Sequence, residues 1–331
     1  MYIRRKDLNA ILEAYGITPH SCTKTARGLV NYNWIVDAGK NKYILRGSRF
    51  KKRKELEFEI KYLNYLKTHG FEYQIPSAVR SRAGHFVKEF SGINFWVYTY
   101  IDGEFKRHPE RQELRAIAVM MGKYHTILEQ SQFGVSHKKD IIRMNSIITG
   151  IKRQSNRLRG NSSHIDSLYL KYSKILVPAA ENLCLEGYSK LKRYPLHRDF
   201  GMRNFLWNGK QLTGIIDFEN VSGPAEPLVR DISSFFQYHC RKRKYEMDLD
   251  MTRYFLAKYL KYRRITAMEI KLIPDLMISM YAEDFDFGYW RLKNDPKRAS
   301  ASEFELCAKS ARWCAANSDR IIQNLKASLE N

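Results

Sequence analysis

Hydrophobic and polar residues alternate in two stretches of the first hundred residues, which is the pattern of half-buried β-strands. Residues 29–47, LVNYNWIVDAGKNKYILRG, alternate on both sides of a polar break at 37–41 and predict two antiparallel strands joined by a turn. Residues 85–104, HFVKEFSGINFWVYTYIDGE, predict a second strand pair with its turn at Ser91-Gly92. Together the two stretches predict a small antiparallel sheet.

Helical periodicity marks the segments around and after this sheet. The N-terminal residues have the pattern of a short amphipathic helix, and residues 55–70 place apolar side chains three and four positions apart before a glycine. Beyond Gly103, residues 111–130 and 141–188 have helical periodicity, and so does most of the chain after Asp231. A long, mainly helical region therefore follows the sheet.

This order of elements predicts an α+β fold with two lobes. Residues 1–101 are expected to form a small N-terminal lobe built on the antiparallel sheet, and residues 102–331 a larger, mainly helical C-terminal lobe. A chain of 331 residues is long enough to give each lobe a hydrophobic core.

Charge narrows the class of partner. The chain has 57 Lys and Arg against 35 Asp and Glu, a formal net charge of +22, which favours anionic partners such as nucleotide phosphates. The basic residues are dispersed, with local runs at 49–57 and 240–246 that we interpret as solvated faces. Neither zinc-finger spacing nor an RNA-recognition signature accompanies them, so nucleic acid is not the favoured partner.

Cysteine usage and hydropathy indicate a cytoplasmic protein. The five cysteines are scattered and form no Cys-x-x-Cys pair, which predicts neither a disulfide framework nor a zinc site. No apolar run approaches the roughly 20 residues of a membrane helix, and the N-terminus lacks the features of a secretory signal. We therefore expect no membrane partner.

A short hairpin is predicted within residues 196–219, LHRDFGMRNFLWNGKQLTGIIDFE. Asn208-Gly209 is a strong hairpin signal because both turn residues must accept positive φ. We expect Trp207 to pair with Lys210 across this turn, which sends the two strands back along each other.

Three polar residues gather at one end of this hairpin: Asn204 where its first strand starts, Asp217 where its second strand ends, and Asp199 in the preceding loop. A carboxylate and an amide oxygen suit Mg²⁺, which takes few protein ligands and completes its shell with phosphate oxygens. A second carboxylate that the metal does not need can accept a proton from an attacking hydroxyl. Each residue alone would also fit a turn or a helix cap.

The order of these residues resembles the catalytic and metal-binding segments of the aminoglycoside phosphotransferase and choline kinase superfamily. HRDFGMRN, residues 197–204, precedes the hairpin, and IIDFE, residues 215–219, follows its second strand. The resemblance implies a protein-kinase-like fold in which Asp199 is the catalytic carboxylate that orients or deprotonates the acceptor hydroxyl. It also implies that Asn204 and Asp217 are Mg²⁺ ligands and that ATP or GTP is the phosphoryl donor.

The N-terminal half supports the same resemblance. Residues 25–36, TARGLVNYNWIV, resemble the family's phosphate-covering loop, which implies nucleotide contacts at Gly28 and Asn31. Arg46 stands where the family has a Lys or Arg that reaches the nucleotide phosphates. Among the glutamates of the following helix we favour Glu59 as the partner of Arg46, with a solvated glutamate as the alternative.

Further segments match the family outside the catalytic stretch. VYTYIDGE, residues 97–104, resembles the hinge between the lobes, which implies that backbone groups of Tyr100 and Ile101 meet the adenine. An ordinary edge strand and turn is the alternative for that segment. His125 and Asp231 lie in two more matching segments, where we interpret them as scaffold rather than chemistry.

The sequence departs from the family beside the catalytic carboxylate. Many small-molecule kinases of the family have His-Gly-Asp and then a basic residue or histidine two positions after the Asp, whereas this chain has His-Arg-Asp and Gly201. Arg198 or Arg203 would have to supply the positive charge at the transferred phosphoryl group, and Arg203 is taken as a catalytic candidate. His197 matches the family's loop-bracing histidine and is interpreted as structural.

The acceptor site is the part that the motifs define least. Residues 281–290, YAEDFDFGYW, contain Glu283, Asp284 and Asp286 with flanking aromatic residues, which can hold an amine by charge and cation–π contact. An amphipathic helix end is the alternative. The net charge of +22 disfavours a polycationic aminoglycoside, so a small hydroxylated metabolite or a sugar derivative is the expected acceptor.

These observations predict an ATP- and Mg²⁺-dependent phosphotransferase that acts on a hydroxyl group of a small molecule such as a sugar or an amino alcohol. The segments DFGMRNF and IIDFENV are also similar to the spore-coat-associated kinase-like branch of the superfamily. The alternative is therefore a kinase-fold structural protein of the spore coat, with a coat or assembly partner and little activity. A protein kinase ranks third because no Ala-Pro-Glu segment follows Asp217.

Overall fold

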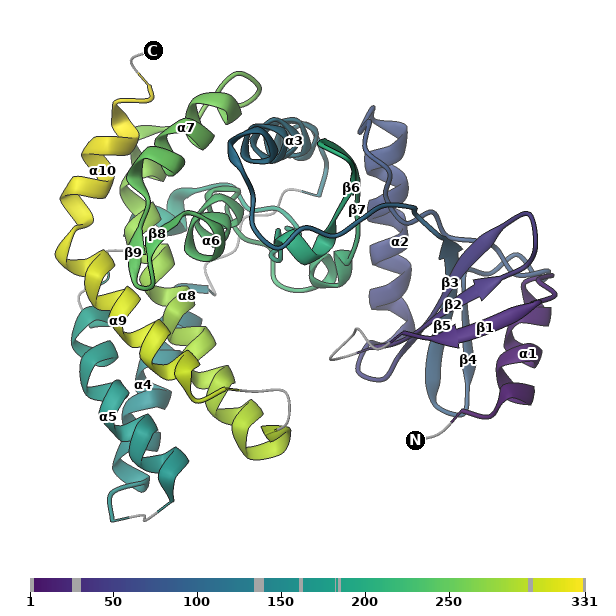
Figure 1. The fold of residues 1–331 in the computed structure, drawn as a ribbon, viewed down its shortest axis with the longest axis horizontal. Helices are drawn as coiled ribbons and strands as arrows, with labels where there is room; N and C mark the ends of the chain where they lie inside the picture. Colours follow the sequence, from purple (N-terminus) through teal and green to yellow (C-terminus); the bar gives the residue numbers. More distant parts are fainter. Residues whose placement is uncertain are drawn as a thin grey trace. The chain divides into compact units, whose positions relative to one another are not determined.

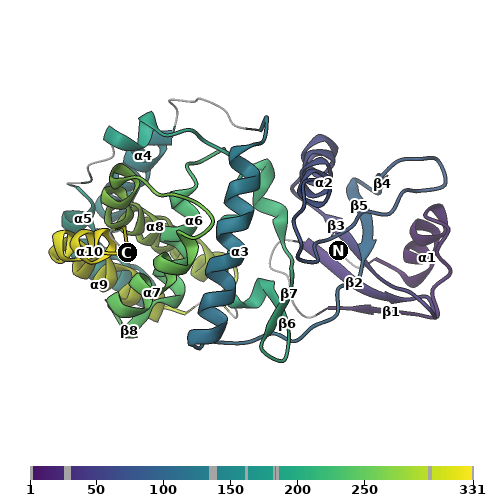
Figure 2. The same cartoon turned by 90° about the horizontal axis from the view of Figure 1, so that it is seen from above.

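The computed structural model describes residues 3–25, 31–133, 140–160, 163–181, 183, 186–296 and 300–329. The chain divides into two compact units, whose elements Figures 1 and 2 show from two sides. Unit 1 comprises Met1–Arg107 and Met202–Pro224, and unit 2 comprises His108–Gly201 and Ala225–Asn331.

Unit 1 contains a five-stranded antiparallel sheet with the strand order β1-β2-β3-β5-β4. The strands are β1 (Ser21–Lys24), β2 (Asn31–Asp37), β3 (Lys42–Ser48), β4 (Val87–Phe90) and β5 (Ile93–Thr99). Asp37 pairs with Lys42 and Phe90 pairs with Ile93, so both predicted strand pairs and their turns are confirmed. The edge strand β1 is short and mostly exposed, and its sequence SCTK has no alternation from which it could be predicted.

Alternation along β3 and β5 gives the sheet an apolar face and a face that carries a charge. The helices of unit 1 are α1 (Arg5–Ala14) and α2 (Arg53–Thr68), which lie on opposite sides of the sheet (Figures 1 and 2). Leu45, Phe95 and Val97 are fully buried in a core cluster with the apolar residues of α1. Arg46 and Trp96 pair one position along each strand and therefore point to the other face.

A two-stranded hairpin from much later in the chain also belongs to unit 1. Its elements are the 3₁₀-helix η2 (Met202–Asn204), β6 (Phe205–Asn208), β7 (Gln211–Ile215) and the 3₁₀-helix η3 (Phe218–Ser222). The backbones of Glu104 and Trp207 exchange two hydrogen bonds, and Gln74 is bonded to Thr213 and Ile215. Because these bonds attach the hairpin to the N-terminal residues, the units differ from the predicted lobes 1–101 and 102–331.

The hairpin turn lies one residue later than predicted. Asn208 remains in β6 and pairs with Gln211, so the two-residue turn is Gly209-Lys210 and the expected pairing of Trp207 with Lys210 was wrong. Gly209 has a φ of +57° at the first turn position, which is where a type II′ turn requires glycine. A register shift beside Trp207 pairs that residue with Leu212 instead.

Unit 2 is mainly helical, as the periodicity after Gly103 predicts. Its elements are α3 (Arg111–Glu129), α4 (Asp140–Arg157), α5 (His164–Ala180), η1 (Glu186–Lys190), α6 (Val229–His239), β8 (Arg241–Arg243), β9 (Glu246–Met247), α7 (Leu249–Tyr259), α8 (Ala267–Asn294), α9 (Ser302–Ala316) and α10 (Ser318–Lys326). The hairpin of β8 and β9 has too few residues to show a pattern in the sequence. The long helix α8 packs against α5, α6, α9 and α10, which makes it the central element of unit 2.

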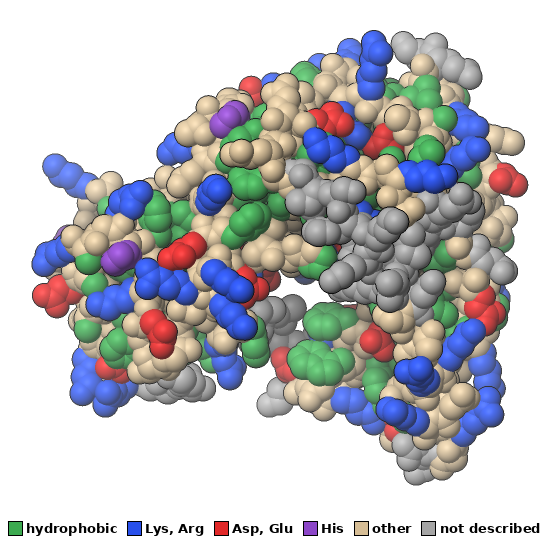
Figure 3. Space-filling view, turned by 180° about the vertical axis from the view of Figure 1, so that it is seen from behind, with side chains coloured by type: hydrophobic (Ala, Val, Ile, Leu, Met, Phe, Trp, Pro, Cys, Tyr) green, Lys and Arg blue, Asp and Glu red, His purple; other side chains and the backbone are tan. Residues whose placement is uncertain are grey.

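The surface carries the dispersed positive charge that the composition indicates. Figure 3 shows Lys and Arg side chains scattered over the visible faces of both units. The cysteines at positions 22, 240, 307 and 314 are free thiols. In the described part of the chain, every helix is too short or too polar to cross a membrane.

Candidate active site

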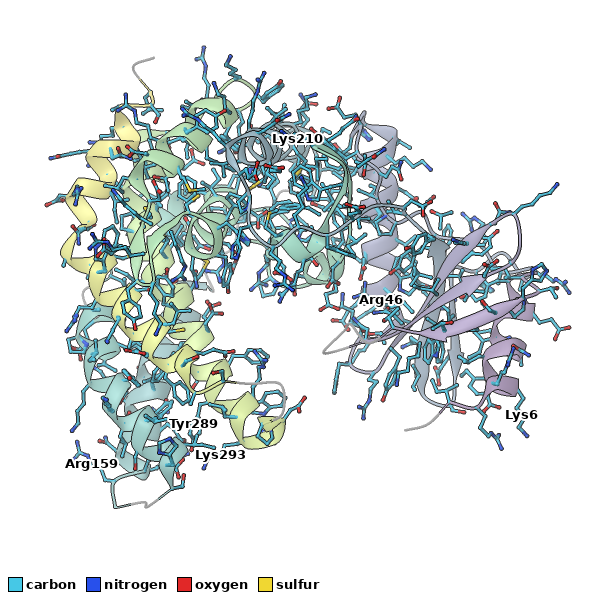
Figure 4. All side chains as sticks on the ribbon, viewed as in Figure 1. Lys6, Arg46, Arg159, Lys210, Tyr289 and Lys293 are labelled. Atoms are coloured by element: carbon cyan, nitrogen blue, oxygen red, sulfur yellow. The ribbon has the colours of Figure 1, made fainter. Side chains whose placement is uncertain are left out.

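The β3 residue Arg46 is the centre of a charge cluster in unit 1, and Figure 4 marks its position. Its Nη2 donates to Asp217 Oδ1 at 2.8 Å and to Glu219 Oε2 at 2.6 Å. Its Nη1 lies 3.7 Å from Oε1 of Glu59 in α2, so the pairing that the sequence favoured is present. Arg46 is only 5% exposed and Glu59 is buried as well, so water screens this ion pair less than those with the partly exposed Asp217 and Glu219.

Lys51 supplies the second cation of this cluster. Its Nζ lies 3.0 Å from Glu59 Oε2 and 2.9 Å from Ser222 Oγ, and it also donates to the backbone carbonyl of Glu219. We use "charge cluster" for the side chains of Arg46, Lys51, Glu59, Asp217 and Glu219. Three carboxylates then share two cations, which leaves the cluster with one formal negative charge.

Asp217 and Asn204 lie at the same end of the hairpin, as the sequence predicts. The backbone N–H of Ile216 donates to the Asn204 carbonyl at 3.0 Å, directly before Asp217. Asp217 has a φ of +69° and a ψ of +52°, the left-handed region that few residues besides glycine adopt. Asp is one of the few non-glycine residues that adopt this region with some frequency, and here the conformation sets the direction of the Asp217 side chain at the end of β7.

The charges of the cluster shift the acid–base equilibria of its members. Burial acts to lower the pKa of the Arg46 guanidinium, but the carboxylates of Asp217, Glu59 and Glu219 outweigh it and raise that pKa. Burial raises the pKa of Glu219, and the neighbouring charge of Asp217 raises it further. The charge cluster therefore carries an excess of negative charge.

Of the two residues predicted to contact the nucleotide phosphates, Gly28 and Asn31, the structure describes only one. Gly28 lies outside the described residues. Asn31, at the start of β2, is buried, and its Nδ2 donates to the Glu219 carboxylate. The Asn31 side chain thus joins the predicted loop segment to the residue two positions after Asp217.

The hinge candidates continue from the last strand of the sheet. The Tyr100 N–H donates to the Lys42 carbonyl at 3.0 Å, which extends the β3–β5 ladder by one residue. Ile101 packs against Gly214 of β7, where a Cβ would lie 2.9 Å from the Ile101 side chain. The Tyr100 N–H thus has a partner in the sheet, and contact of either residue with an adenine remains a prediction of the sequence.

Asp199 belongs to unit 2, at the end of a loop that is braced from several sides. The His197 ring stacks on Phe200 with a centroid separation of 4.4 Å, and its Nδ1 accepts from the Asp199 N–H at 3.3 Å. The N–H of Arg198, which has a φ of +61°, donates to Asp231 Oδ1 at 2.9 Å. The backbone on both sides of the Asp199 amide is thus held by buried groups.

The brace extends behind Asp231 into the helical core. Asp231 Oδ2 lies 3.4 Å from His125 Nε2, and His125 Nδ1 lies 2.7 Å from the hydroxyl of Tyr259. All three side chains are fully buried, and burial lowers the pKa of His125. These contacts support the interpretation of His125 and Asp231 as scaffold.

The two arginines considered as a source of positive charge have different surroundings. Arg198 Nε lies 3.5 Å from Glu226 Oε2, so its charge is already opposed by a carboxylate in unit 2. Arg203 is in η2 of unit 1 and is exposed. The catalytic role of Arg203 stays a prediction of the sequence.

The acidic residues predicted near the acceptor all lie on α8. Glu283 Oε2 accepts from Arg230 Nη2 at 2.7 Å. Asp284 Oδ2 accepts from Gln237 Nε2 and from the Tyr238 hydroxyl, each at 2.7 Å. Asp286 is exposed, and because α8 continues to Asn294 the segment is not a helix end.

A comparison with known proteins gives the family. A model of the phosphotransferase enzyme family matches residues 21–258, which is more than half of the chain. The chain belongs to this family. A homoserine kinase of Bradyrhizobium diazoefficiens is 22% identical to this phosphotransferase over 277 residues, which cover 82% of this chain and 77% of that protein.

Solved structures show the fold of this phosphotransferase. Amicoumacin kinase hAmiN, in complex with AMP-PNP, Ca²⁺ and Ami, has a TM-score of 0.64 at 17% identity and covers 96% of this chain and 94% of its own. A microcompartment-associated aminopropanol kinase has a TM-score of 0.64 at 15% identity, with 97% and 98% covered. These structures confirm the predicted kinase-like α+β fold. The family match and the homoserine kinase relative confirm the predicted resemblance and the assignment as a small-molecule phosphotransferase.

Sequence reasoning missed two members of the charge cluster. Glu219 stands two residues after Asp217 in the quoted IIDFE segment, so its position on the same short element was a usable signal. Lys51 lies in the basic run 49–57, which we interpreted as a solvated face. That interpretation was wrong for Lys51, because its ion pair with Glu59 and its bond to Ser222 hold it in the interior of unit 1.

Proposed function

We propose that this phosphotransferase transfers the γ-phosphoryl group of ATP to a hydroxyl group of a small amino alcohol or a related metabolite. The observation that carries the proposal is the position of Asp217, next to Asn204 and in contact with Arg46. The homoserine kinase and the aminopropanol kinase named above support the acceptor class, because both names denote acceptors that carry an amine and a hydroxyl.

The donor atoms near Asp217 fit a divalent metal. Asn204 offers an amide oxygen and Asp217 a carboxylate, which together suit a hard cation such as Mg²⁺. The charge cluster has one more carboxylate than cations, so an added positive charge is favoured there. Glu219 is a further oxygen donor on the same short element. When bound, the metal would neutralise the phosphate oxygens and the charge that develops on them.

The remaining roles follow from the chemistry of phosphoryl transfer. The acceptor oxygen attacks the γ-phosphorus, the bond to the β-phosphate oxygen breaks, and ADP leaves. Asp199 would orient the acceptor hydroxyl and take its proton. Arg46 would contact the nucleotide phosphates, with Glu59 holding the guanidinium in place, and Arg203 would add positive charge at the transferred group.

Thermal unfolding of the full chain tests the donor half of this proposal. ATP with Mg²⁺ should raise the midpoint of the wild type by several degrees, because ligand bound only to the folded state stabilises it. The same addition should leave Asp217→Asn unshifted from its own ligand-free midpoint, while Asp199→Asn keeps the shift. A wild type that ignores ATP and Mg²⁺, or an unchanged shift in Asp217→Asn, would contradict the assignment.

The alternative of a kinase-fold structural protein makes a different prediction about partner binding. A coat or assembly protein would bind its partner equally well with and without Asp199 and Asp217. The relatives and structures named above give this role no support, so it stays a prediction of the sequence alone. The cytoplasmic location is likewise a prediction of the sequence, which names ATP or GTP as the donor without choosing between them.

A further inference from the structure

One face of α8 combines a carboxylate with exposed aromatic rings. We define the α8 face as Glu283, Asp284, Phe287, Trp290 and Arg291, which a period of 3.6 residues per turn places on one side of the helix. Phe287 and Trp290 are 51% and 58% exposed, whereas the neighbouring residues Tyr281, Ala282, Phe285 and Gly288 are buried. Apolar rings on an otherwise well-packed helix mark a surface that is kept open.

The opposite side of the same helix segment is fixed to α5. Tyr289 donates its hydroxyl to Asp166 Oδ1 at 2.8 Å, and Lys293 Nζ lies 2.8 Å from the same oxygen. Figure 4 shows Tyr289 and Lys293 together on this helix. Since these bonds fix the rotation of α8, the exposure of Phe287 and Trp290 is a property of the fold rather than of a loose helix end.

Ion pairs connect the α8 face to the loop that carries Asp199. Arg198, the residue before Asp199, is opposed by Glu226, which also pairs with Arg230. Arg230 in turn donates to Glu283, the residue before Asp284. This chain lies entirely within unit 2 and links the catalytic-loop candidate to the first acid of the α8 face.

Asp284 differs from Glu283 in forming no ion pair within the described part of the chain, although the charge of Arg230 acts on it from farther away. Its two hydrogen bonds come from the neutral groups of Gln237 and Tyr238, and both reach the same oxygen, Oδ2. Across the described residues, no Lys or Arg lies within ion-pair distance of Asp284. Burial raises its pKa to about 6, and a cation placed beside it would reverse that shift.

The two rings beside Asp284 form a stacked pair. The Phe287 and Trp290 centroids are 5.7 Å apart with an angle of 12° between the rings. The Arg291 guanidinium lies 5.9 Å from the Phe287 centroid, so this ring already attracts one cation. Residues three apart on a helix have Cβ atoms about 5–6 Å from each other, which sets the spacing from Asp284 to Phe287 and from Phe287 to Trp290.

We propose that the α8 face binds the acceptor, and that the acceptor is an alcohol with a protonated amine for Asp284 and an aromatic ring or similar flat apolar group for Phe287 and Trp290. This inference rests on the proposed function and deepens it. An amino acid as small as homoserine has no group for the two rings, so an acceptor with a ring attached to its amine is bound more tightly.

Three simple alcohols separate the two halves of this site. N-Benzylethanolamine carries the hydroxyl, the amine and the ring, ethanolamine lacks the ring, and 2-benzyloxyethanol replaces the amine with a neutral ether. Calorimetric titration of the wild type should show that N-benzylethanolamine binds about tenfold more tightly than either of the others, since one ring contact or one charge contact is worth about that factor.

Variants assign each preference to its residues. Phe287→Ala and Trp290→Ala should abolish the advantage of N-benzylethanolamine over ethanolamine, and Asp284→Asn should abolish its advantage over 2-benzyloxyethanol. Met268→Ala is the matched control, because Met268 is also an exposed apolar residue of α8 but lies five turns away, at the start of the helix. It should keep both preferences.

Equal binding of the three alcohols by the wild type would overturn the inference, and so would preferences that survive in the Phe287, Trp290 and Asp284 variants. The stabilisation by ATP and Mg²⁺, measured on the same samples, separates this failure from that of the proposed function. If ATP and Mg²⁺ stabilise the protein but it binds the three alcohols equally, the proposed function stands and the proposed acceptor class is wrong. If ATP and Mg²⁺ do not stabilise the protein, the proposed function itself is wrong.

Discussion

The charge cluster of unit 1 and the α8 face of unit 2 use carboxylates in opposite ways. In the charge cluster, Arg46 contacts all three carboxylates, and Lys51 adds a second cation to Glu59. On the α8 face, Asp284 has only neutral donors, and two aromatic rings beside it are exposed. The first arrangement satisfies most of its charge within the protein, whereas the second leaves charge and apolar surface for a molecule from outside.

The proposed donor and acceptor roles of the two regions account for this difference. Under the proposed function the charge cluster handles the phosphoryl donor, and fixed charges on rigid elements suit that role. Under the proposed acceptor role, a helix face whose acid has only neutral donors among the described residues, with two exposed rings, can be altered to suit another acceptor without disturbing the fold. Four substitutions test the contrast, beginning with the largest effect.

Asp199→Asn should nearly abolish turnover. Loss of a general base lowers the rate by about 10²–10⁴-fold, because the acceptor proton has no nearby carboxylate to receive it. ADP release with homoserine and with aminopropanol measures the effect, and unfolding in urea checks that the variant is folded. Turnover within a factor of two of the wild type would remove Asp199 from the mechanism.

Glu59→Gln should destabilise the protein by roughly 3 kcal/mol, because it removes the carboxylate that the buried Arg46 and the partly buried Lys51 share. The matched control is Glu57→Gln on the same helix, since Glu57 pairs with Arg53 at the surface and both side chains are about half exposed. That variant should change the free energy of unfolding by less than about 0.5 kcal/mol. Equal urea midpoints for the two variants would mean that the charge cluster does not hold unit 1 together.

Asp284→Asn should stabilise the protein at neutral pH. The pKa of Asp284 is raised from 3.8 to about 6, so the folded state binds its proton more tightly than the unfolded state and the ionised form costs stability above that pH. We expect a gain of about 2 kcal/mol at pH 7.5 that shrinks as the pH falls from about 6 and is absent near 4. Unfolding in urea across this range measures the gain.

The exposed Asp250 of α7 provides the control for this pH dependence. Asp250→Asn should leave the free energy of unfolding within about 0.5 kcal/mol of the wild type at every pH. A gain in Asp284→Asn that persists at pH 4 would show that the stabilisation has a cause other than the buried charge.

Tyr259→Phe should have the smallest effect. It removes the hydroxyl that lies 2.7 Å from His125 Nδ1, which costs about 1–2 kcal/mol for a buried hydrogen bond. Tyr254→Phe on the same helix is the control, because the Tyr254 ring stacks with Arg111 and Lys258 without relying on its hydroxyl. If the scaffold interpretation holds, turnover of Tyr259→Phe falls by no more than a few fold when assayed well below its unfolding temperature.

Local patterns were sufficient for the sheet, most helices and the ends of the hairpin. Alternation placed the turns after Asp37 and at Ser91-Gly92, and the two-strand pattern placed Asn204 and Asp217 at the same end of the hairpin. Both depend on neighbours in sequence, because strand pairing across a tight turn has few alternatives. The sequence analysis missed the short strand β1 and the hairpin of β8 and β9. Strands of so few residues are too short to show an alternating pattern of apolar and polar positions.

Contacts between distant segments were beyond any local pattern. Lys51 looked like part of a solvated basic run, and only the return of the chain at Ser222 shows that it is an interior cation. The hairpin looked like part of the second lobe, yet its backbone bonds to Gln74 and Glu104 join it to the first. Each case depends on a partner more than a hundred residues away.

The sequence by itself determined the family and the pair of Arg46 with Glu59, because motif order and helical spacing are short-range information. The roles of Asp199, Asn204 and Asp217 in phosphoryl transfer are predictions from the same motifs. Only the tertiary structure decided how charge is shared, with Glu219 and Lys51 completing the cluster and Glu283 claimed by Arg230 while Asp284 is not. A charge is paired or left open according to which segments meet in space, and that follows from packing of the whole chain.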